Sequence, residues 1–512
     1  MQLSDVSVNR GELAGDAIGE KEGAIYEVNI LYAVTVTNNN VWREQSMKRR
    51  HLIITAGASL AAPALIGGRA NAQSASALGS TLTPVGADPK ASADGLVPAW
   101  TGGITTAPAG WSPGDSVPNL YPDDQPIFTV TPDNMAKYDS MLCEGQRQML
   151  KRYGAAGFRM KVYPSRRSFA APQYVYDNTA KNVTRARPSA RGLIWGFEGA
   201  VGGVPFPIPS SDPNVAGIQI MRNHLTVYKG VYLTANVGQY ICSQGTNVLT
   251  LDESALFSYP YYFEGVTPEN YSGLYLRSMI SYLAPPNQAG GKAAFQGSTD
   301  LTKLENAGFE YLVGEGRIRQ APQVQYDVPF SQGGDAINND EINVFNGAMD
   351  RYNWKLVGKK QMIVMYNSYG FYNGNPGGSL YGTNFVDPEE TRWEVHRCHV
   401  IEATLAPGKR HTMPHRCFYV DEDTWQALMS DGWDEQGNYW RFGNIAPAFL
   451  ISPEGPAPFI TGLVTYNLQS NQYFTTGTWV NGPSPQTGQP VLTTPIPAAS
   501  FDPSSMMASG SL

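Results

Sequence analysis

Two histidines and two cysteines in the last quarter of the chain have the types and the spacing of groups that bind metals or form disulfides. His396 and Cys398 precede the dipeptide Pro407-Gly408, and His415 and Cys417 follow it. Because Pro and Gly suit the two central positions of a type II turn, we expect a β-hairpin centred there. In that register Cys398 lies directly opposite Cys417, within disulfide range, and the two histidines share one face of the sheet.

Three interpretations of this cluster stay open at the level of sequence. An oxidising compartment and the even number of cysteines, 4 in the chain, favour a Cys398–Cys417 disulfide. Thiols and imidazoles are also the ligands that zinc and copper prefer, so a transition-metal site is an alternative. The third is ordinary packing of free cysteines and hydrogen-bonded histidines. We predict no bound metal and no cofactor.

The familiar catalytic motifs do not occur in the sequence. It contains no Gly-x-Ser-x-Gly elbow, no His-Glu-x-x-His and no Gly-rich phosphate loop with a lysine. We therefore predict no enzymatic activity. Arg166 and Arg167 follow Pro164-Ser165 and are candidates to bind an anionic headgroup, although a surface salt bridge is the commoner role of such a pair.

A twin-arginine export signal occupies residues 47–72. It has a basic start with two adjacent arginines, an apolar stretch and a small-x-small cleavage site, Ala70-Asn71-Ala72. Such a signal works only at an amino terminus. We therefore expect translation to start at Met47, so that residues 1–46 lie upstream of the true start. The mature chain then starts at Gln73 and is exported to the periplasm, with association with the outer membrane as a further expectation.

Composition limits the classes of function. The formal net charge is -7 at pH 7, and removing the residues up to Ala72 leaves it unchanged, so the acidic balance argues against a nucleic-acid partner. The 53 Gly and 37 Pro indicate many turns, and the 28 Tyr and 10 Trp favour β-sheet over helical bundles. No apolar run after Ala72 is long enough to span a bilayer, so we expect no transmembrane segment.

We expect an extended arm, two early helices and a series of strands. Residues 73–130 are rich in Pro, Gly, Ser and Thr, which favours an arm without regular structure. Apolar residues at helical spacing predict helices over 131–153 and 218–228. Strands are predicted over 173–176, 231–241, 352–357, 361–366, 393–405 and 411–420, with a further pair joined at Asp434–Gly437. This order predicts an antiparallel α+β or barrel-like fold.

Several long motifs resemble the family described as domain of unknown function 1329. They are Lys161–Arg167, Tyr176–Asn182, Gly203–Pro209, Asp350–Lys360, Val400–Leu405, Gly408–His411 and Phe418–Trp425. The resemblance implies the fold of the lipoprotein-sorting carriers: a strongly curved, incomplete antiparallel β-barrel of the α+β class, with helices covering its concave face. It assigns residues 131–490 to one such domain and residues 491–512 to a flexible tail. Cys398, Cys417 and His415 lie outside the family pattern, which argues against a family-wide disulfide or metal role.

The resemblance also implies a function, a periplasmic carrier of a lipid or another hydrophobic molecule. Its expected partners are an inner-membrane exporter of the resistance-nodulation-division type and an outer-membrane protein. Large side chains are the candidates to line the apolar cavity: Tyr174, Tyr176, Trp354, Leu356, Met362, Val364 and Tyr366. Two alternatives are a periplasmic enzyme or metal-binding protein that uses the His/Cys hairpin, and a scaffold of an envelope complex that binds partners through the Pro/Gly-rich arm.

Overall fold

The computed structural model describes residues 75–106, 118–321, 326–373, 380–452, 455–478 and 495–507, without the side chains of 451–459. The predicted signal peptide and residues 1–46 lie outside these ranges. No helix within them is long and apolar enough to cross a membrane.

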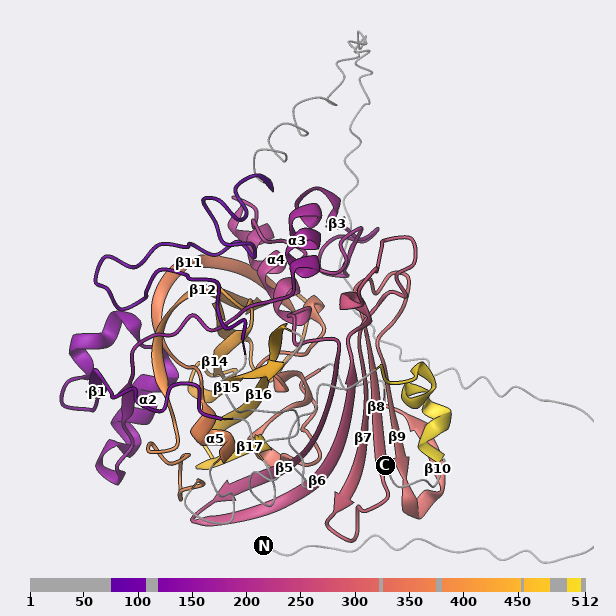
Figure 1. The fold of residues 1–512 in the computed structure, drawn as a ribbon. Coiled ribbons are helices and arrows are strands. Elements are labelled where there is room, and N and C mark those ends of the chain that lie inside the picture. Colours follow the sequence, from indigo (N-terminus) through magenta and orange to yellow (C-terminus); the bar gives the residue numbers. More distant parts are fainter. Residues whose placement is uncertain are drawn as a thin grey trace, which may run out of the picture. The chain divides into compact units, whose positions relative to one another are not determined.

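Most of the described chain belongs to one sheet of 15 strands that is almost entirely antiparallel and is not closed (Figure 1). The strands follow the order β1-β2-β12-β13-β14-β15-β16-β17-β5-β6-β7-β8-β9-β10, and β11 pairs with β12. Their bounds are β1 Phe128–Val130, β2 Met160–Val162, β5 Tyr232–Ser243, β6 Thr246–Ser258, β7 Leu274–Ala284, β8 Lys292–Ser298, β9 Ala307–Leu312, β10 Arg317–Gln320, β11 Tyr352–Met365, β12 Trp393–Leu405, β13 His415–Asp421, β14 Ala427–Trp433, β15 Tyr439–Ser452, β16 Gly455–Asn467 and β17 Gln472–Thr478. A separate ladder joins β3 Arg187–Pro188 to β4 Phe197–Glu198. The prediction of a largely β fold with a few helices is confirmed.

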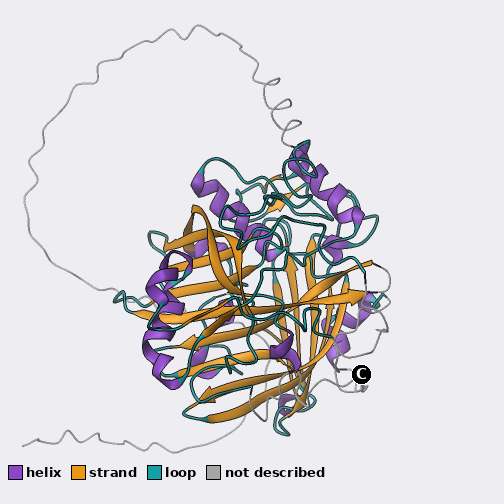
Figure 2. Ribbon diagram, turned by 60° about the vertical axis from the view of Figure 1, so that its left-hand side comes forward, coloured by secondary structure: helices purple, strands orange, loops and turns teal. Residues whose placement is uncertain are grey.

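Helices and short 3-10 turns lie around this sheet (Figure 2). The described ones are α2 Glu144–Tyr153, α3 Gln173–Arg185, α4 Pro213–Leu225, α5 Tyr369–Asn373, η1 Met135–Met141, η2 Gly154–Ala156, η3 Pro260–Tyr262, η4 Val313–Glu315, η5 Gly334–Ala336, η6 Asn339–Glu341, η7 Met349–Arg351, η8 Ala498–Phe501 and η9 Pro503–Met507. α4 begins at an Asp212 cap with Pro213 in its first turn. Gly217 lets α4 approach β11, since a Cβ there would lie 2.8 Å from the backbone nitrogen of Lys355.

The prediction of a strand over residues 173–176 is wrong. These residues start helix α3, whose buried side chains Val175, Thr179 and Asn182 recur at helical spacing. The spacing over the whole segment outweighs the β propensity of Tyr-Val-Tyr. The predicted helix over 131–153 is divided into the 3-10 turn η1 and helix α2.

A β-bulge joins two predicted strands into one. The strands predicted over 352–357 and 361–366 form the continuous strand β11, whose pairing with β12 shifts between Leu356 and Gly358. A bulge inserts an extra residue and breaks the alternation of side chains between the two faces. Trp354 and Met362 therefore point toward opposite faces of the sheet, although both have even numbers.

The apolar core has a main body and a small satellite. The main core includes the fully buried Trp354, Trp393 and Trp425. The satellite lies on the outer face of β7–β9 and joins Met279 and Ala294 to Phe501 and Met506. These last two residues come from η8 and η9, drawn in yellow beside β9 and β10 in Figure 1. Residues 495–507, part of the predicted flexible tail, therefore pack on the sheet.

The described part of the predicted arm packs against the fold. Val85 and Val97 are buried, and the carbonyl of Val85 accepts a hydrogen bond of 2.9 Å from Nε1 of Trp425. An arm without helices or long strands thus contributes apolar side chains to the main core.

Candidate ligand-binding cavity

A cavity of about 630 Å³ lies over the strands β5–β9. Its floor is the inner face of these strands. Its other walls come from the end of α4 and the residues that follow it (224–229), from residues 328–346, and from β15–β17. Ligand pockets in proteins typically have volumes of about 300–1,000 Å³. The cavity is therefore large enough to enclose a small hydrophobic molecule.

The floor owes its shape to the alternation of side chains along the strands. On the inner face, Ala235 lies opposite Ala255, Ala255 lies opposite Ile280, and Ile280 lies opposite Ala293, and all four line the cavity. The alternate residues point outward, where Met279 belongs to the satellite core. Three alanines in one row leave the volume that larger side chains would fill.

Two basic side chains lie at the wall next to the end of α4. Nζ of Lys229 donates hydrogen bonds to Oδ1 of Asn343 at 2.9 Å and to Oγ1 of Thr461 at 3.3 Å. Burial lowers the pKa of Lys229 to about 7, because desolvation disfavours the ammonium. Burial also lowers the pKa of His224 to about 3, so its ring is neutral and bonds the carbonyl of Phe345 at 2.8 Å.

Gln239 and Glu253 form a polar pair on the mostly apolar floor. Nε2 of Gln239 donates to Oε2 of Glu253 at 2.7 Å, and both residues line the cavity. Burial raises the pKa of Glu253 to about 8; the hydrogen bond from Gln239 opposes this shift and the neighbouring Asp252 adds to it. The carboxyl is therefore mostly protonated at neutral pH.

The seven side chains predicted to line a cavity lie outside the wall of this one. Trp354, Met362, Val364 and Tyr366 are buried in the main core, Leu356 is partly exposed on β11, and Tyr174 and Tyr176 lie on α3. The phenol of Tyr174 contacts the cavity wall from outside, since it donates to the carbonyl of the lining residue Tyr262 at 3.0 Å. The bulge in β11 and the helical form of α3 separate these residues from one another.

The two arginines predicted to bind a headgroup form ion pairs with carboxylates of the protein, Arg166 at the surface and Arg167 in the interior. Arg166 is partly exposed and pairs with Asp124 at 2.5 Å. Arg167 has a side chain that is 2% exposed and donates to both oxygens of Asp423, at 2.9 and 2.7 Å. A ligand anion would have to displace a buried carboxylate from Arg167, so we interpret this arginine as structural.

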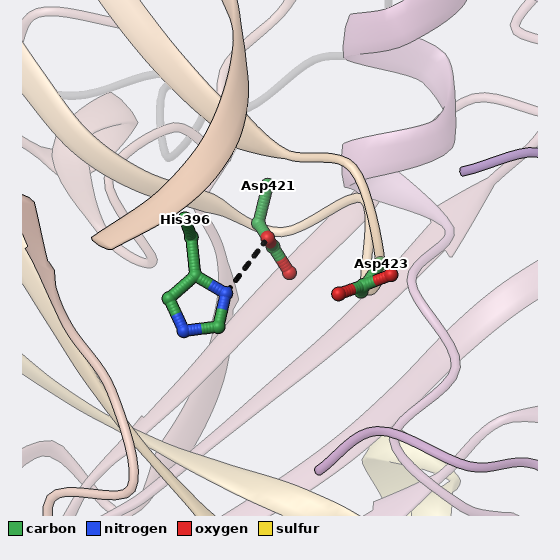
Figure 3. Close-up of side chains that lie close together, drawn as sticks. All are labelled: His396, Asp421 and Asp423. Atoms are coloured by element: carbon green, nitrogen blue, oxygen red, sulfur yellow. Dashed lines mark ion pairs between the residues drawn. The ribbon is translucent and has the colours of Figure 1, made fainter. Parts of the chain in front are cut away.

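His396, Asp421 and Asp423 come together in the same region (Figure 3). One potential ligand atom from each lies within 4.8 Å of the others, and Nδ1 of His396 is 3.8 Å from Oδ1 of Asp421. Burial raises the pKa of Asp421 to about 6, with Asp423 adding to the shift and His396 opposing it. Because both oxygens of Asp423 already accept hydrogen bonds from Arg167, the cluster is better explained as a buried ion-pair network than as a metal site.

The predicted hairpin register is wrong by four residues. Cys398 lies opposite Asp421, and Cys417 lies opposite Glu402. The connection between β12 and β13 runs from residue 406 to residue 414, so it is longer than a two-residue turn. Both thiols are free in the structure.

The same register separates the two histidines. His415 lies opposite Thr404, eight residues from His396, which is about 26 Å along the strand. Its Nε2 approaches Glu402 at 3.2 Å and its ring stacks on Trp433. The structure therefore does not assemble the four predicted metal ligands.

Sequence reasoning missed most of the residues that form the cavity floor. Of the floor strands β5–β9, only β5 is predicted from the sequence. β6 also alternates, since its residues Leu251, Glu253, Ala255 and Phe257 line the cavity. A run of alternating residues whose inward members include alanine would have predicted these strands. Small inward side chains also indicate where a sheet leaves open space.

Comparison with known proteins identifies the family. Residues 129–506 match the family described as "Protein of unknown function (DUF1329)". The uncharacterized protein PA3922 of Pseudomonas aeruginosa is 32% identical over 409 residues, which cover 80% of this chain and 88% of that protein. A crystal structure of a DUF1329 family protein from Desulfovibrio piger has 14% identity and a TM-score of 0.39, covering 58% of this chain and 100% of that one. A putative outer membrane lipoprotein-sorting protein domain from Vibrio parahaemolyticus has 10% identity, the same TM-score of 0.39 and the same coverage of 58% and 100%. The predicted membership is confirmed, and the chain belongs to the DUF1329 family.

Proposed function

We propose that this protein is a periplasmic carrier or binding protein for a lipid or another hydrophobic molecule. The observation that supports this is the cavity of about 630 Å³ over β5–β9, whose floor is built from Ala, Leu, Ile and Phe side chains. Transfer of a methylene group from water into such a site gains about 0.8 kcal/mol, so about ten buried methylenes supply about 8 kcal/mol, which corresponds to micromolar affinity. The proposal assigns no reaction to the cavity.

The proposal extends to location and partners. The twin-arginine signal in the sequence supports a periplasmic location. An exporter of the resistance-nodulation-division type and an outer-membrane protein are the proposed partners, as the family resemblance implies. Helices over the concave face are likewise part of the proposal, and the end of α4 supplies His224 and Leu225 to the cavity wall.

Native mass spectrometry of the mature protein tests the carrier function. The protein starting at Gln73 is purified from periplasm and compared with an Ala235→Trp variant, whose new side chain occupies the cavity floor. We expect a discrete lipid-sized adduct on the wild type, released on denaturation, and a bare mass for the variant. A bare mass for both proteins would contradict the proposal, and equal adducts on both would place the ligand elsewhere.

Two further measurements separate the alternatives. Deletion of residues 75–126 tests the scaffold alternative, which predicts loss of partner capture with ligand binding intact. Metal analysis of the same preparation tests the metal-protein reading, which requires one bound ion per chain. We expect partner capture to persist and the metal content to be well below one ion per chain.

A further inference from the structure

The polar pair on the cavity floor is buried among mostly apolar side chains. Gln239 and Glu253 are 6% and 7% exposed, and they lie on the inner face of β5 and β6. Gln239 lies opposite Leu251, and Glu253 lies between Val237 and Tyr282 on the two neighbouring strands. Two strongly polar side chains are thus enclosed by mostly apolar neighbours.

The hydrogen bonding of this pair is incomplete within the described part of the chain. Nε2 of Gln239 bonds Oε2 of Glu253 at 2.7 Å, but Oε1 of Gln239 is buried and has no hydrogen-bond partner among the described residues. Among those residues, no Lys, Arg or His lies within 4.0 Å of the Glu253 carboxyl. A buried acceptor without a partner is costly, so its retention points to a group that binds there.

Protonation decides what the pair offers to a ligand. Burial raises the pKa of Glu253 to about 8, so at neutral pH its carboxyl carries a proton and can donate a hydrogen bond. Oε1 of Gln239 can accept one. Both residues line the cavity, so the pair supplies one donor and one acceptor on its floor.

We infer that Gln239 and Glu253 bind a hydroxyl group of the ligand, so that the carried molecule is a hydrophobic alcohol. A hydroxyl both donates and accepts, and it can satisfy Gln239 and Glu253 together without bringing a charge into the cavity. A carboxylate ligand lacks the proton that Gln239 needs, and an ammonium requires Glu253 to ionise. The inference rests on the proposed carrier function and names its ligand class.

Competition among four probes of equal chain length tests the inference. 1-Dodecanol, 1-chlorododecane, dodecylamine and dodecanoate each displace N-phenyl-1-naphthylamine from the wild-type mature protein at pH 7. We expect 1-dodecanol to bind about tenfold more tightly than 1-chlorododecane, the ratio typical of one good buried hydrogen bond. Glu253→Leu and Gln239→Leu should each reduce that ratio to near one.

Two further variants keep the test specific. Glu253→Gln retains a donor at this position and should retain the preference for the alcohol. Ser278→Ala removes another hydroxyl from the same floor, where it lies two strands away from Gln239, and should also leave the preference unchanged. Circular dichroism and thermal unfolding of each variant establish that the fold is intact.

Each contrary outcome has a distinct meaning. Equal binding of 1-dodecanol and 1-chlorododecane by the wild type overturns the inference and leaves the carrier function standing. A preference for dodecylamine that Glu253→Gln abolishes also overturns the inference, and so does a preference for dodecanoate that Glu253→Leu does not change. Both outcomes leave the carrier function standing. If neither the fluorescent probe nor any of the four competitors binds, the proposed carrier function fails as well.

Discussion

Two parts of the same sheet differ in how completely side chains fill the space beside them. In the filled half, β11–β14, large side chains such as Trp354 and Phe418 pack against each other, and an ion-pair network surrounds His396. In the hollow half, β5–β9, one face carries a row of small side chains that includes Ala235 and Ala255, and the space above them stays open. Both halves share strand geometry and strand pairing. Whether a curved sheet binds a ligand therefore depends on the size of the inward side chains.

Removal of a buried charge should have the largest effect, and it acts on the filled half. Arg167→Leu leaves Asp423 buried without its bidentate partner, which should lower the free energy of unfolding by about 3–5 kcal/mol. The control, Arg166→Leu, removes an arginine whose side chain is 43% exposed and should cost about 1 kcal/mol or less. Urea unfolding measures both. Equal costs would mean that the network does not stabilise the filled half.

A pair of alanine substitutions compares the two halves directly. Ala403 lies opposite Trp354 in the filled half and is 0% exposed, so Ala403→Phe should cost about 1–3 kcal/mol through overpacking. Ala235→Phe adds the same group to the hollow half, where the cavity accommodates it. We expect a change in stability of about 0.5 kcal/mol or less together with loss of probe binding. A large loss of stability for Ala235→Phe would mean that the cavity is closed in solution.

The pH dependence of stability should carry the signature of Glu253. Its pKa is about 8 in the folded protein against 4.5 for the unfolded chain, so the folded state holds the extra proton between these values. Stability contributed by this group is present at low pH and is lost as pH rises from about 5 to about 8.

Glu253→Gln isolates this contribution. The variant should gain about 4 kcal/mol relative to wild type at pH 9 compared with pH 5, as measured by urea unfolding at both values. Glu310→Gln changes another cavity-lining carboxyl and serves as the matched control. Asp252 and Tyr282 are the titratable groups nearest to Glu253 and are the same in both variants. An unchanged pH profile for Glu253→Gln would show that the carboxyl is solvated.

The smallest effect concerns the register of the hairpin in the filled half. Glu402 lies directly opposite Cys417, so a Glu402→Cys variant should form a cross-strand disulfide with it under oxidising conditions. In the reduced protein the substitution should alter stability by less than about 1 kcal/mol, because Glu402 is partly exposed. Peptide mapping by mass spectrometry identifies the link. A Cys398–Cys417 link in the wild type would contradict the observed register.

The parts of the fold that follow from local patterns were predictable. Alternation over 231–241 predicts β5, which spans 232–243, and the strand predicted over 393–405 coincides with β12. Apolar residues at a period of 3.6 predict a helix over 218–228, which overlaps most of α4. In these segments the side chains that pack against the rest of the protein recur at the period of the element itself.

The parts that depend on single irregularities were not predictable in the same way. The bulge at Leu356 and Gly358 reverses the orientation of half of β11, and nothing in the alternation indicates where it falls. The long turn after Leu405 moves the hairpin register by four residues, which separates Cys398 from Cys417. The cavity depends on small side chains from several strands in one row, and only the pairing of those strands brings them together.

The outer face of β7–β9 has a mechanical consequence. The floor of the cavity is a single layer of strands, and the bending stiffness of such a layer depends on what packs behind it. Phe501 and Met506 pack behind it, against Met279 and Ala294. The C-terminal turns therefore support the floor from behind. Any force or modification that detaches them would soften the floor and change the volume of the cavity above it, although neither turn lines the cavity.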